Sequence, residues 1–251
     1  MNRTVSRPAL LLDLGVADYL NVWRLQRRLV RARSEGLISD ALILVEHPPV
    51  FTMGRKANEE NILSRTLPVY YIERGGDVTY HGPGQIVGYP IIKLDEGRLD
   101  LRRYLRSLEE VLIGALRDWD LGGERSSRQT GVWLNGKKIA SIGIAVQRWV
   151  CFHGFALNVN TSLRYFDLIR PCGLEGQVIT SMKDALGHEV DLRGVKDSVL
   201  RHFQEVFEVE LRATSEAALP LPYPEEGSPA NEAPAPADQE ESAERVSSNR
   251  S

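Results

Sequence analysis

The sequence "GVWLNGKKIASIGIAV", residues 131–146, predicts a β-hairpin. Asn135 and Gly136 stand between two runs that are rich in apolar and β-branched residues. Asn-Gly between such runs is the strongest short-range signal for a hairpin with a two-residue turn. We therefore expect two antiparallel strands here, within a sheet that contains antiparallel pairs.

The residues on either side of this hairpin predict an α+β fold, with mixed sheets flanked by helices. Apolar runs bounded by turn residues predict further strands at residues 41–47, 69–74, 85–94 and 151–160. Apolar residues at helical spacing predict helices at residues 16–36, 100–119 and 194–209. Strands outnumber helices, and the helices occur singly. This order favours a fold in which helices pack on a mixed or antiparallel sheet, and it argues against a doubly wound fold.

The composition suits one globular domain whose two cysteines are free, reduced thiols. The chain has 251 residues, of which 42% are hydrophobic, and it lacks both a long apolar run and a secretory signal. We therefore expect a cytoplasmic protein with no membrane span. The two cysteines, Cys151 and Cys172, occur without a Cys-x-x-Cys pair or a histidine cluster, which argues against a disulfide framework and against a zinc site.

The last part of the chain differs from the rest in charge and composition. Residues 213–251 contain eight acidic and two basic residues, a net charge of −6, in a segment rich in Pro, Ala, Ser and Glu. Because the whole chain carries −3, residues 1–212 are mildly basic at +3. A segment with so few large apolar groups does not bury enough surface to offset its ordering entropy. We expect a catalytic domain at 1–212 and a disordered acidic tail at 213–251.

Cys172 lies in the turn-like sequence "LIRPCGLEG", residues 168–176. A structural cysteine usually lies among apolar residues of a helix or strand, where it packs as a small hydrophobe. Here Pro171 restricts the chain before the thiol, and Gly173 lets backbone N–H groups approach the sulfur. This setting favours a nucleophile, although one cysteine alone does not establish it.

The glycine-rich segment "RGGDVTYHGPGQIVGYP", residues 74–90, is a candidate ligand-binding wall. It lacks the Gly-Lys-Ser/Thr ending of a phosphate-binding P-loop, and its later glycines miss the dinucleotide-binding spacing. Its polar side chains include those of Arg74, Asp77, Tyr80 and His81. A tight system of β-turns would also explain the glycines, but it would not need so many polar groups.

Lys138 follows the predicted hairpin turn, at the start of the second strand. Strict alternation puts Lys138, Ala140, Ile142 and Ile144 on one face and Lys137, Ile139, Ser141 and Gly143 on the other. Lys138 would then extend a mostly apolar face. Either it reaches past the hairpin end into water, or it lies in a pocket where its charge alters a neighbouring group.

These segments together resemble the lipoyl(octanoyl) transferases, or octanoyl-acyl carrier protein:protein N-octanoyltransferases. The motifs that carry the resemblance are "RGGDVTYHGPGQIVGYPI", "GKKIASIGI", "HGFALNV", "IRPCG" and "VITSM", in that order, within residues 10–205. The resemblance implies a fold similar to the catalytic domains of biotin and lipoate protein ligases. It also implies transfer of an octanoyl group from acyl carrier protein to a lysine amine of a lipoyl domain, in lipoate biosynthesis.

The resemblance further implies roles for individual residues. Cys172 would carry the octanoyl group as a thioester, and Lys138 would lower the pKa of that thiol or relay its proton. Contacts with the substrate would come from Arg74, Gly75, Gly76, Asp77, Val78, Thr79, Tyr80 and His81, from Ser141, Ile142 and Gly143, and from Gly154, Phe155 and Ala156. Both acyl transfers are downhill, so neither a cofactor nor a metal is expected.

The expected partners are proteins rather than nucleic acid or membrane. The donor would be octanoyl-acyl carrier protein, and the acceptors would be lipoyl domains of 2-oxoacid dehydrogenase subunits and the glycine cleavage H protein. Three other functions remain open from the sequence. They are an ATP-dependent lipoate or biotin protein ligase, a cysteine hydrolase that pairs Cys172 with His81 or His153, and a non-catalytic module that binds acyl carrier protein.

Overall fold

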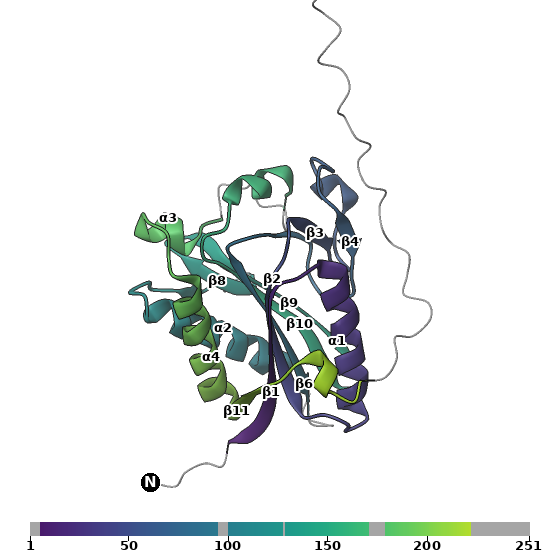
Figure 1. Cartoon of the computed structure of the whole chain (residues 1–251). Coiled ribbons are helices and arrows are strands. Elements are labelled where there is room, and N and C mark those ends of the chain that lie inside the picture. Colours follow the sequence, from purple (N-terminus) through teal and green to yellow (C-terminus); the bar gives the residue numbers. More distant parts are fainter. Residues whose placement is uncertain (1–5, 95–99, 128, 171–178, 222–251) are drawn as a thin grey trace, which may run out of the picture.

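A computed structural model describes residues 6–94, 100–127, 129–170 and 179–221 (Figure 1). It contains one large and one small β-sheet, with helices on both sides, so the predicted α+β fold is confirmed. In the described residues, no helix has the length and apolar character that crossing a membrane requires.

The large sheet has eight strands in the order β11-β1-β2-β6-β10-β9-β8-β7. Their bounds are β1 Arg7–Val16, β2 Asp40–Glu46, β6 Gln85–Lys93, β7 Glu124–Arg125, β8 Gly131–Leu134, β9 Lys137–Gln147, β10 Val150–Asn158 and β11 Val209–Ala213. Strand β1 runs parallel to β11 and β2, and the other neighbours are antiparallel. The small sheet has the order β4-β3-β5, with bounds Val69–Tyr71, Val50–Met53 and Val78–His81.

The predicted hairpin is formed by β8 and β9. Asn135 and Gly136 both have positive φ angles, 49° and 77°, as a two-residue turn of the favoured hairpin type requires. One feature of the hairpin departs from the prediction. The register between β8 and β9 shifts, because Trp133 pairs with Lys138 while Val132 pairs with Ala140, which leaves Ile139 as an extra residue in β9. This β-bulge changes the faces that the following residues share.

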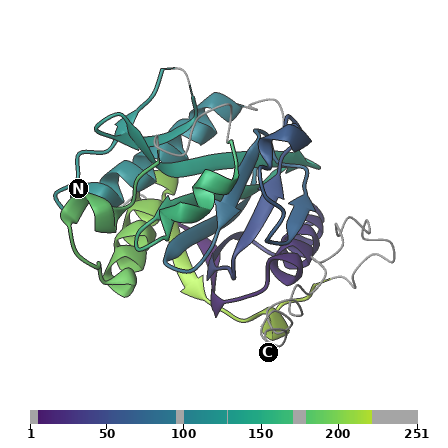
Figure 2. The same ribbon diagram turned by 90° about the horizontal axis from the view of Figure 1, so that it is seen from above.

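Helices cover both faces of the large sheet. Their bounds are α1 Tyr19–Ser34, α2 Leu101–Arg117, α3 Met182–Leu186 and α4 Leu192–Phe207, with short 3-10 helices at Glu59–Asn61, Leu163–Leu168 and Glu216–Ala218. Figure 2 shows the sheet between the purple α1 on one side and the green α4 on the other. Each of the three long predicted helices is present, because each has an apolar stripe to bury and an N-terminal Asp whose side chain caps its first turn.

Two hydrophobic cores fill these layers, one under α1 and one under α2 and α4. Leu25 and Leu29 of α1 pack with Ile43 of β2, whereas Leu108 and Leu112 of α2 pack on the opposite face of the sheet. A third, smaller core lies beneath the small sheet. The functional cavity described below is bordered by the α1 side of the large sheet and by the small sheet.

The packed chain continues beyond residue 212, where we placed the domain boundary. Thr214 donates a backbone hydrogen bond to Leu11 at 2.9 Å, and Arg28 pairs with Glu216. Leu219 and Leu221 pack against the core under α1. Residues 213–221, which we expected in the tail, are therefore folded against the domain, and residues 222–251 lie outside the described part of the chain.

Candidate active site

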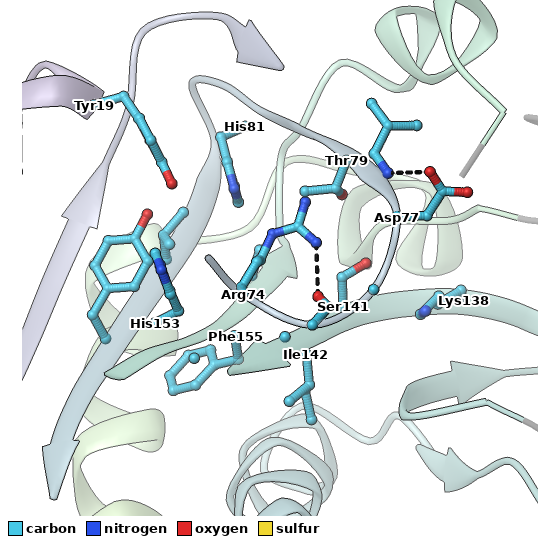
Figure 3. A pocket seen from close by; sticks show the side chains of 18 of the residues that line it. Tyr19, Arg74, Asp77, Thr79, His81, Lys138, Ser141, Ile142, His153 and Phe155 are labelled. Atoms are coloured by element: carbon cyan, nitrogen blue, oxygen red, sulfur yellow. Dashed lines mark hydrogen bonds between the residues drawn. The ribbon is translucent and has the colours of Figure 1, made fainter. Parts of the chain in front are cut away.

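A cavity opens between the glycine-rich loop and the middle of the large sheet (Figure 3). It encloses about 720 Å³, counting the open space at its mouth. Its walls are Tyr19, Arg74, Gly75, Gly76, Asp77, Val78, Thr79, His81, Val87, Tyr89, Lys138, Ser141, Ile142, Gly143, His153, Gly154, Phe155, Ala156, Phe166 and Ile179.

The glycine-rich loop closes directly onto strand β9. The backbone N–H of Gly75 donates to the carbonyl of Ile144 at 2.8 Å. Close approach requires a glycine on the strand as well. A Cβ atom on Gly143 would lie 3.1 Å from the Gly75 carbonyl oxygen and 3.0 Å from Cδ of Arg74. The absence of side chains at these positions therefore brings the loop and the strand together as two walls of one cavity.

Arg74 is a buried cation in this loop, with 8% of its surface exposed. Its Nη2 donates to the carbonyl oxygen of Thr52 at 2.8 Å and to the hydroxyl of Thr52 at 3.0 Å. Its Nη1 donates to the carbonyl of Gly75 at 3.1 Å (Figure 3). These acceptors hold the guanidinium in place while part of it borders the cavity, where it favours a negatively charged or strongly polar ligand group.

Lys138 lines the cavity from strand β9, and Lys137 is exposed. The prediction that Lys138 shares a face with Ala140 is wrong. Ile139 and Ala140 both pack into the core beneath α2, because the bulge at Ile139 interrupts the alternation. Lys138 instead lies on the cavity side with Ser141, whereas Ile142, which also borders the cavity, directs its side chain toward the core beneath α2 (Figure 3). Its Nζ lies 5.7 Å from the ring centroid of Trp133.

Cys172 lies outside the described residues, so its predicted role is not tested by the geometry. The described residues on either side of its segment are firmly placed. Arg170 donates a backbone hydrogen bond to Asn61 at 2.8 Å. Ile179 lines the cavity and pairs with Lys138 in a parallel β-bridge. Ile179, seven residues after Cys172 in the sequence, therefore lies directly beside Lys138.

The end of the cavity away from Lys138 is polar, and sequence reasoning found only part of it (Figure 3). Tyr19 and Tyr89 border the cavity here together with His81 and His153. Burial lowers the pKa of His81 to about 3. Burial also lowers the pKa of His153, against the opposing influence of Glu73, and it raises the pKa of both tyrosines. At neutral pH these four groups are uncharged and present hydrogen-bonding atoms to the cavity.

His153 has an unusual backbone conformation for a strand residue, with φ at 55°. Its N–H donates to the side-chain oxygen of Gln26 at 3.0 Å. Its Nε2 lies 3.5 Å from Oε2 of Glu73, which is longer than a normal hydrogen bond. Glu73 in turn accepts from Trp23 Nε1 at 3.0 Å. The positive φ turns the imidazole toward α1, where strict alternation along β10 would not place it.

Thirteen of the fourteen residues that we predicted to contact the substrate line the cavity. Tyr80 does not. It is fully buried on the other side of β5, where its ring stacks on Tyr165 at 4.9 Å and meets Phe51 edge-on at 6.0 Å. Cys151, the other cysteine of the chain, is fully buried, and burial raises its pKa to about 12.

Five lining residues were missed from the sequence: Tyr19, Val87, Tyr89, Phe166 and Ile179. Val87 and Tyr89 alternate along β6, so their shared face was readable once that strand was recognised. Tyr19, the first residue of α1, and Phe166, in a 3-10 helix, reach the cavity only through tertiary packing. Among the described residues, no group of three His, Cys, Asp or Glu side chains is arranged to hold a metal ion.

The layered fold and this cavity place the protein in the structural class of the lipoate protein ligases. The crystal structure of lipoate-protein ligase A bound with ATP has a TM-score of 0.66 and 16% identity, covering 84% of this chain and 90% of that one. The T. acidophilum protein Ta0514 with bound lipoic acid has a TM-score of 0.70 and 17% identity, covering 83% and 89%. At such identities, the likeness concerns the fold.

The chain belongs to the lipoyl protein ligase A/B catalytic domain family, whose model matches residues 18–204. It is similar to the octanoyltransferase of Rubrobacter xylanophilus, with 49% identity over 201 residues, or 76% of this chain and 90% of that protein. The octanoyltransferase of Syntrophotalea carbinolica is 47% identical over 207 residues, covering 82% and 98%. The resemblance noted in the sequence thus extends over nearly the whole length of these relatives.

Proposed function

We propose that this protein is an acyltransferase that moves an octanoyl group from acyl carrier protein to a lysine amine of lipoyl domains. The observation that carries the proposal is one cavity that unites the glycine-rich loop, Lys138 and Ile179. Ile179 is seven residues beyond Cys172 in the sequence. Relatives named octanoyltransferase at 43–49% identity support the same activity.

In the first half-reaction, the thiolate of Cys172 attacks the carbonyl carbon of the octanoyl thioester. The carrier's thiolate leaves and takes up a proton, and a new thioester forms on Cys172. A cation beside the thiol favours the thiolate, which is the reactive species. Lys138 is the candidate for this role. Backbone N–H groups near Ser141 are candidates to stabilise the oxyanion of the tetrahedral intermediate.

In the second half-reaction, the lysine amine of the acceptor attacks the thioester on Cys172. An amide forms, the amine loses a proton, and the thiolate of Cys172 leaves. Conversion of a thioester to an amide is downhill, so this route does not consume ATP. The proposed acceptors are lipoyl domains of 2-oxoacid dehydrogenase subunits and the glycine cleavage H protein.

An ATP-dependent ligase is the second candidate, because a solved neighbour of the same fold binds ATP. Such an enzyme would activate free octanoate as an acyl-adenylate and would not need an acylated cysteine. At 16% identity that neighbour supports the shared fold rather than a shared reaction. The two candidates differ in the acyl donor that they require and in the presence of a covalent intermediate.

Intact-protein mass spectrometry after mixing with octanoyl-acyl carrier protein tests the proposal. We expect an octanoyl adduct that hydroxylamine removes, as a thioester requires. Cys172→Ser should give no such adduct and no transfer to a lipoyl domain. Cys151→Ser is the matched control, because that thiol is buried in the core and does not line the cavity. This variant should still form the adduct and transfer the octanoyl group to a lipoyl domain.

The opposite pattern in the two cysteine variants would disprove Cys172 as the nucleophile. Transfer from free octanoate and ATP, without any adduct, would identify a ligase instead. An enzyme that binds octanoyl-acyl carrier protein but neither forms the adduct nor modifies a lipoyl domain would be a non-catalytic binding module.

A further inference from the structure

A chain of buried hydrogen bonds runs from the cavity to the residue that follows Ile179. Nδ1 of His81 lies 2.8 Å from Oε1 of Gln85. Nε2 of Gln85 donates to Oδ1 of Asn158 at 2.9 Å, and Nδ2 of Asn158 donates to the carbonyl oxygen of Thr180 at 3.0 Å. All four residues are less than 9% exposed, so these bonds are shielded from competing water.

The donor and the acceptor of every hydrogen bond in this chain follow from the bond to the carbonyl group of Thr180. The carbonyl oxygen of Thr180 can only accept, so the Asn158 amide nitrogen faces it and the Asn158 oxygen faces Gln85. The Gln85 nitrogen must then point to Asn158, where it also donates to the carbonyl oxygen of Tyr80 at 3.2 Å. That leaves the Gln85 oxygen toward His81. Because this oxygen can only accept, Nδ1 of His81 carries the hydrogen.

The tautomer of His81 follows from this chain, and it determines what His81 offers to a ligand. With the hydrogen on Nδ1, a neutral imidazole has a lone pair on Nε2. Burial, with smaller contributions from the neighbouring His47 and Arg74, lowers the pKa of His81 to about 3, so the ring is neutral at physiological pH. His81 lines the cavity. A ligand group that meets Nε2 must therefore be a hydrogen-bond donor.

The other end of the chain lies beside the proposed catalytic lysine. The backbone N–H of Thr180 donates to the carbonyl oxygen of Lys138 at 3.0 Å, and Ile179 pairs with Lys138. Asn158 thus binds the same residue, Thr180, by donating to the backbone carbonyl oxygen of Thr180. One set of side chains orients His81 and also contacts Thr180, which is hydrogen-bonded to strand β9.

We propose that His81 accepts a hydrogen bond from an N–H group of the substrate through Nε2, and that Gln85 and Asn158 are positioning residues that fix its tautomer. This inference rests on the proposed acyl transfer. The octanoyl chain has no donor, so the N–H belongs either to an amide of the carrier's prosthetic arm or to the amine of the acceptor lysine. The first would contribute to acylation of Cys172 and the second to its deacylation.

The two half-reactions are measured separately by quenched-flow mass spectrometry of the octanoyl adduct, in His81→Phe and His81→Gln. Phenylalanine keeps a ring of similar shape without the acceptor, and glutamine can place an oxygen near the position of Nε2. We expect His81→Phe to slow one half-reaction by about tenfold or more, and His81→Gln to restore most of that loss. Slower acylation would identify the carrier arm as the donor, and slower deacylation the lysine amine.

Asn158→Leu and Asn160→Leu form a matched pair for the positioning role. The side chain of Asn160 also makes hydrogen bonds to the backbone: it accepts from the N–H of Val190 at 2.9 Å and donates to the carbonyl oxygen of Val190 at 2.8 Å. It is not part of the chain that leads to His81. Both variants should lose stability. Only Asn158→Leu should also slow the half-reaction that depends on His81, when both are assayed well below their melting temperatures.

Nitrogen NMR of the imidazoles, with His81 assigned from the His81→Gln spectrum, supplies a direct readout. The wild-type ring should be the neutral Nδ1–H tautomer, and Gln85→Met should produce a mixture of tautomers. A His81→Phe enzyme with both rates within a factor of about two of wild type would overturn the inference, as would a wild-type ring protonated on Nε2. Failure of the wild-type enzyme to form any adduct would instead contradict the proposed function itself.

Discussion

Two adjacent lysines at the start of β9 occupy different environments. Lys138 lines the cavity, whereas Lys137 is exposed beside the hairpin turn. The sequence predicted opposite faces for them, and in the structure their surroundings do differ. The residues predicted to share a face with Lys138 were wrong, because the bulge at Ile139 moves Lys138 to the side of Ser141.

Lys138→Ala should slow acylation of Cys172 by at least about a hundredfold, as expected when a group that assists proton transfer is removed. Alkylation of the thiol by iodoacetamide should also move to higher pH, because a nearby cation would no longer favour the thiolate. Lys138→Arg should rescue poorly, since a guanidinium does not relay a proton. Adduct formation and alkylation against pH are the measurements.

Lys137→Ala is the control for this experiment and should behave almost as wild type. The two variants differ by one position in the chain and remove the same functional group. An inactive Lys137→Ala enzyme beside an active Lys138→Ala enzyme would contradict both the proposed role and the position of Lys138 in the cavity.

At the scale of secondary structure, the two hairpins that contain β9 have very different turns. Asn135 and Gly136 suit the positive φ angles of the β8–β9 turn. Arg148 and Trp149 adopt positive φ angles of 51° and 62° in the two-residue turn between β9 and β10. Such angles are unfavourable by roughly 1–2 kcal/mol for a residue with a Cβ atom. Trp149 is 43% exposed, so packing offsets only part of this strain.

We expect the double variant Arg148→Asn, Trp149→Gly to raise the free energy of unfolding by about 1 kcal/mol. Asn and Gly tolerate positive φ, and glycine's greater freedom in the unfolded chain reduces the gain. The lost ion pair between Arg148 and Glu35, 3.9 Å apart and exposed, is worth little. Urea unfolding measures the change.

Gly136→Ala is the matched test in the other hairpin, where φ is 77°. Alanine should lower the free energy of unfolding there by about 1 kcal/mol, because it introduces the strain that the double variant removes. A lower urea midpoint for the double variant would show that Arg148 and Trp149 stabilise the turn by contacts that exceed their backbone strain.

At the scale of the whole molecule, His47, His81 and His153 are buried, and the last two of them line the cavity. His47 donates through Nδ1 to the carbonyl of Ala17 at 2.8 Å and accepts from the hydroxyl of Tyr89 at 2.9 Å. Burial lowers its pKa to about 4. His81 and His153 are buried with it, and their pKa values are lowered for the same reason.

These histidines should make the folded protein sensitive to acid. The unfolded chain binds protons on His47 and His81 below about pH 6.5, while the folded protein does not until about pH 4 and 3. The contribution of these histidines to the free energy of unfolding is therefore fully present above about pH 6.5, and it is lost as the pH falls below that value. Together the two groups should lower the free energy of unfolding by roughly 4 kcal/mol between pH 7 and pH 5.

Urea unfolding of wild type and His47→Gln at pH 7 and pH 5 checks this prediction. The variant should lose about 2 kcal/mol less than wild type between the two pH values, because the contribution of His47 is absent. Equal losses in both proteins would show that His47 is not the origin of the acid sensitivity.

Local sequence determined the parts of this protein whose cause is local. Asn135-Gly136 specified the β8–β9 turn, since few other dipeptides adopt two positive φ angles without strain. Apolar stripes at helical spacing specified α1, α2 and α4, because each stripe must be buried on one side. The residue types of the glycine-rich segment indicated one part of the cavity wall, whereas the contacts at residues 141–143 and 154–156 were implied by the family resemblance.

Tertiary structure decided the features that depend on contacts between distant residues. Strands β1 and β11 were not found from the sequence, because a parallel pair joins segments about two hundred residues apart and leaves no turn to recognise. Tyr19 reaches the cavity only because α1 packs against β6 and β10, which brings its ring onto that of Tyr70 at 5.4 Å. The bulge at Ile139 places Lys138 in the cavity, and it arises from the pairing of β9 with β8, which strict alternation along one strand does not contain.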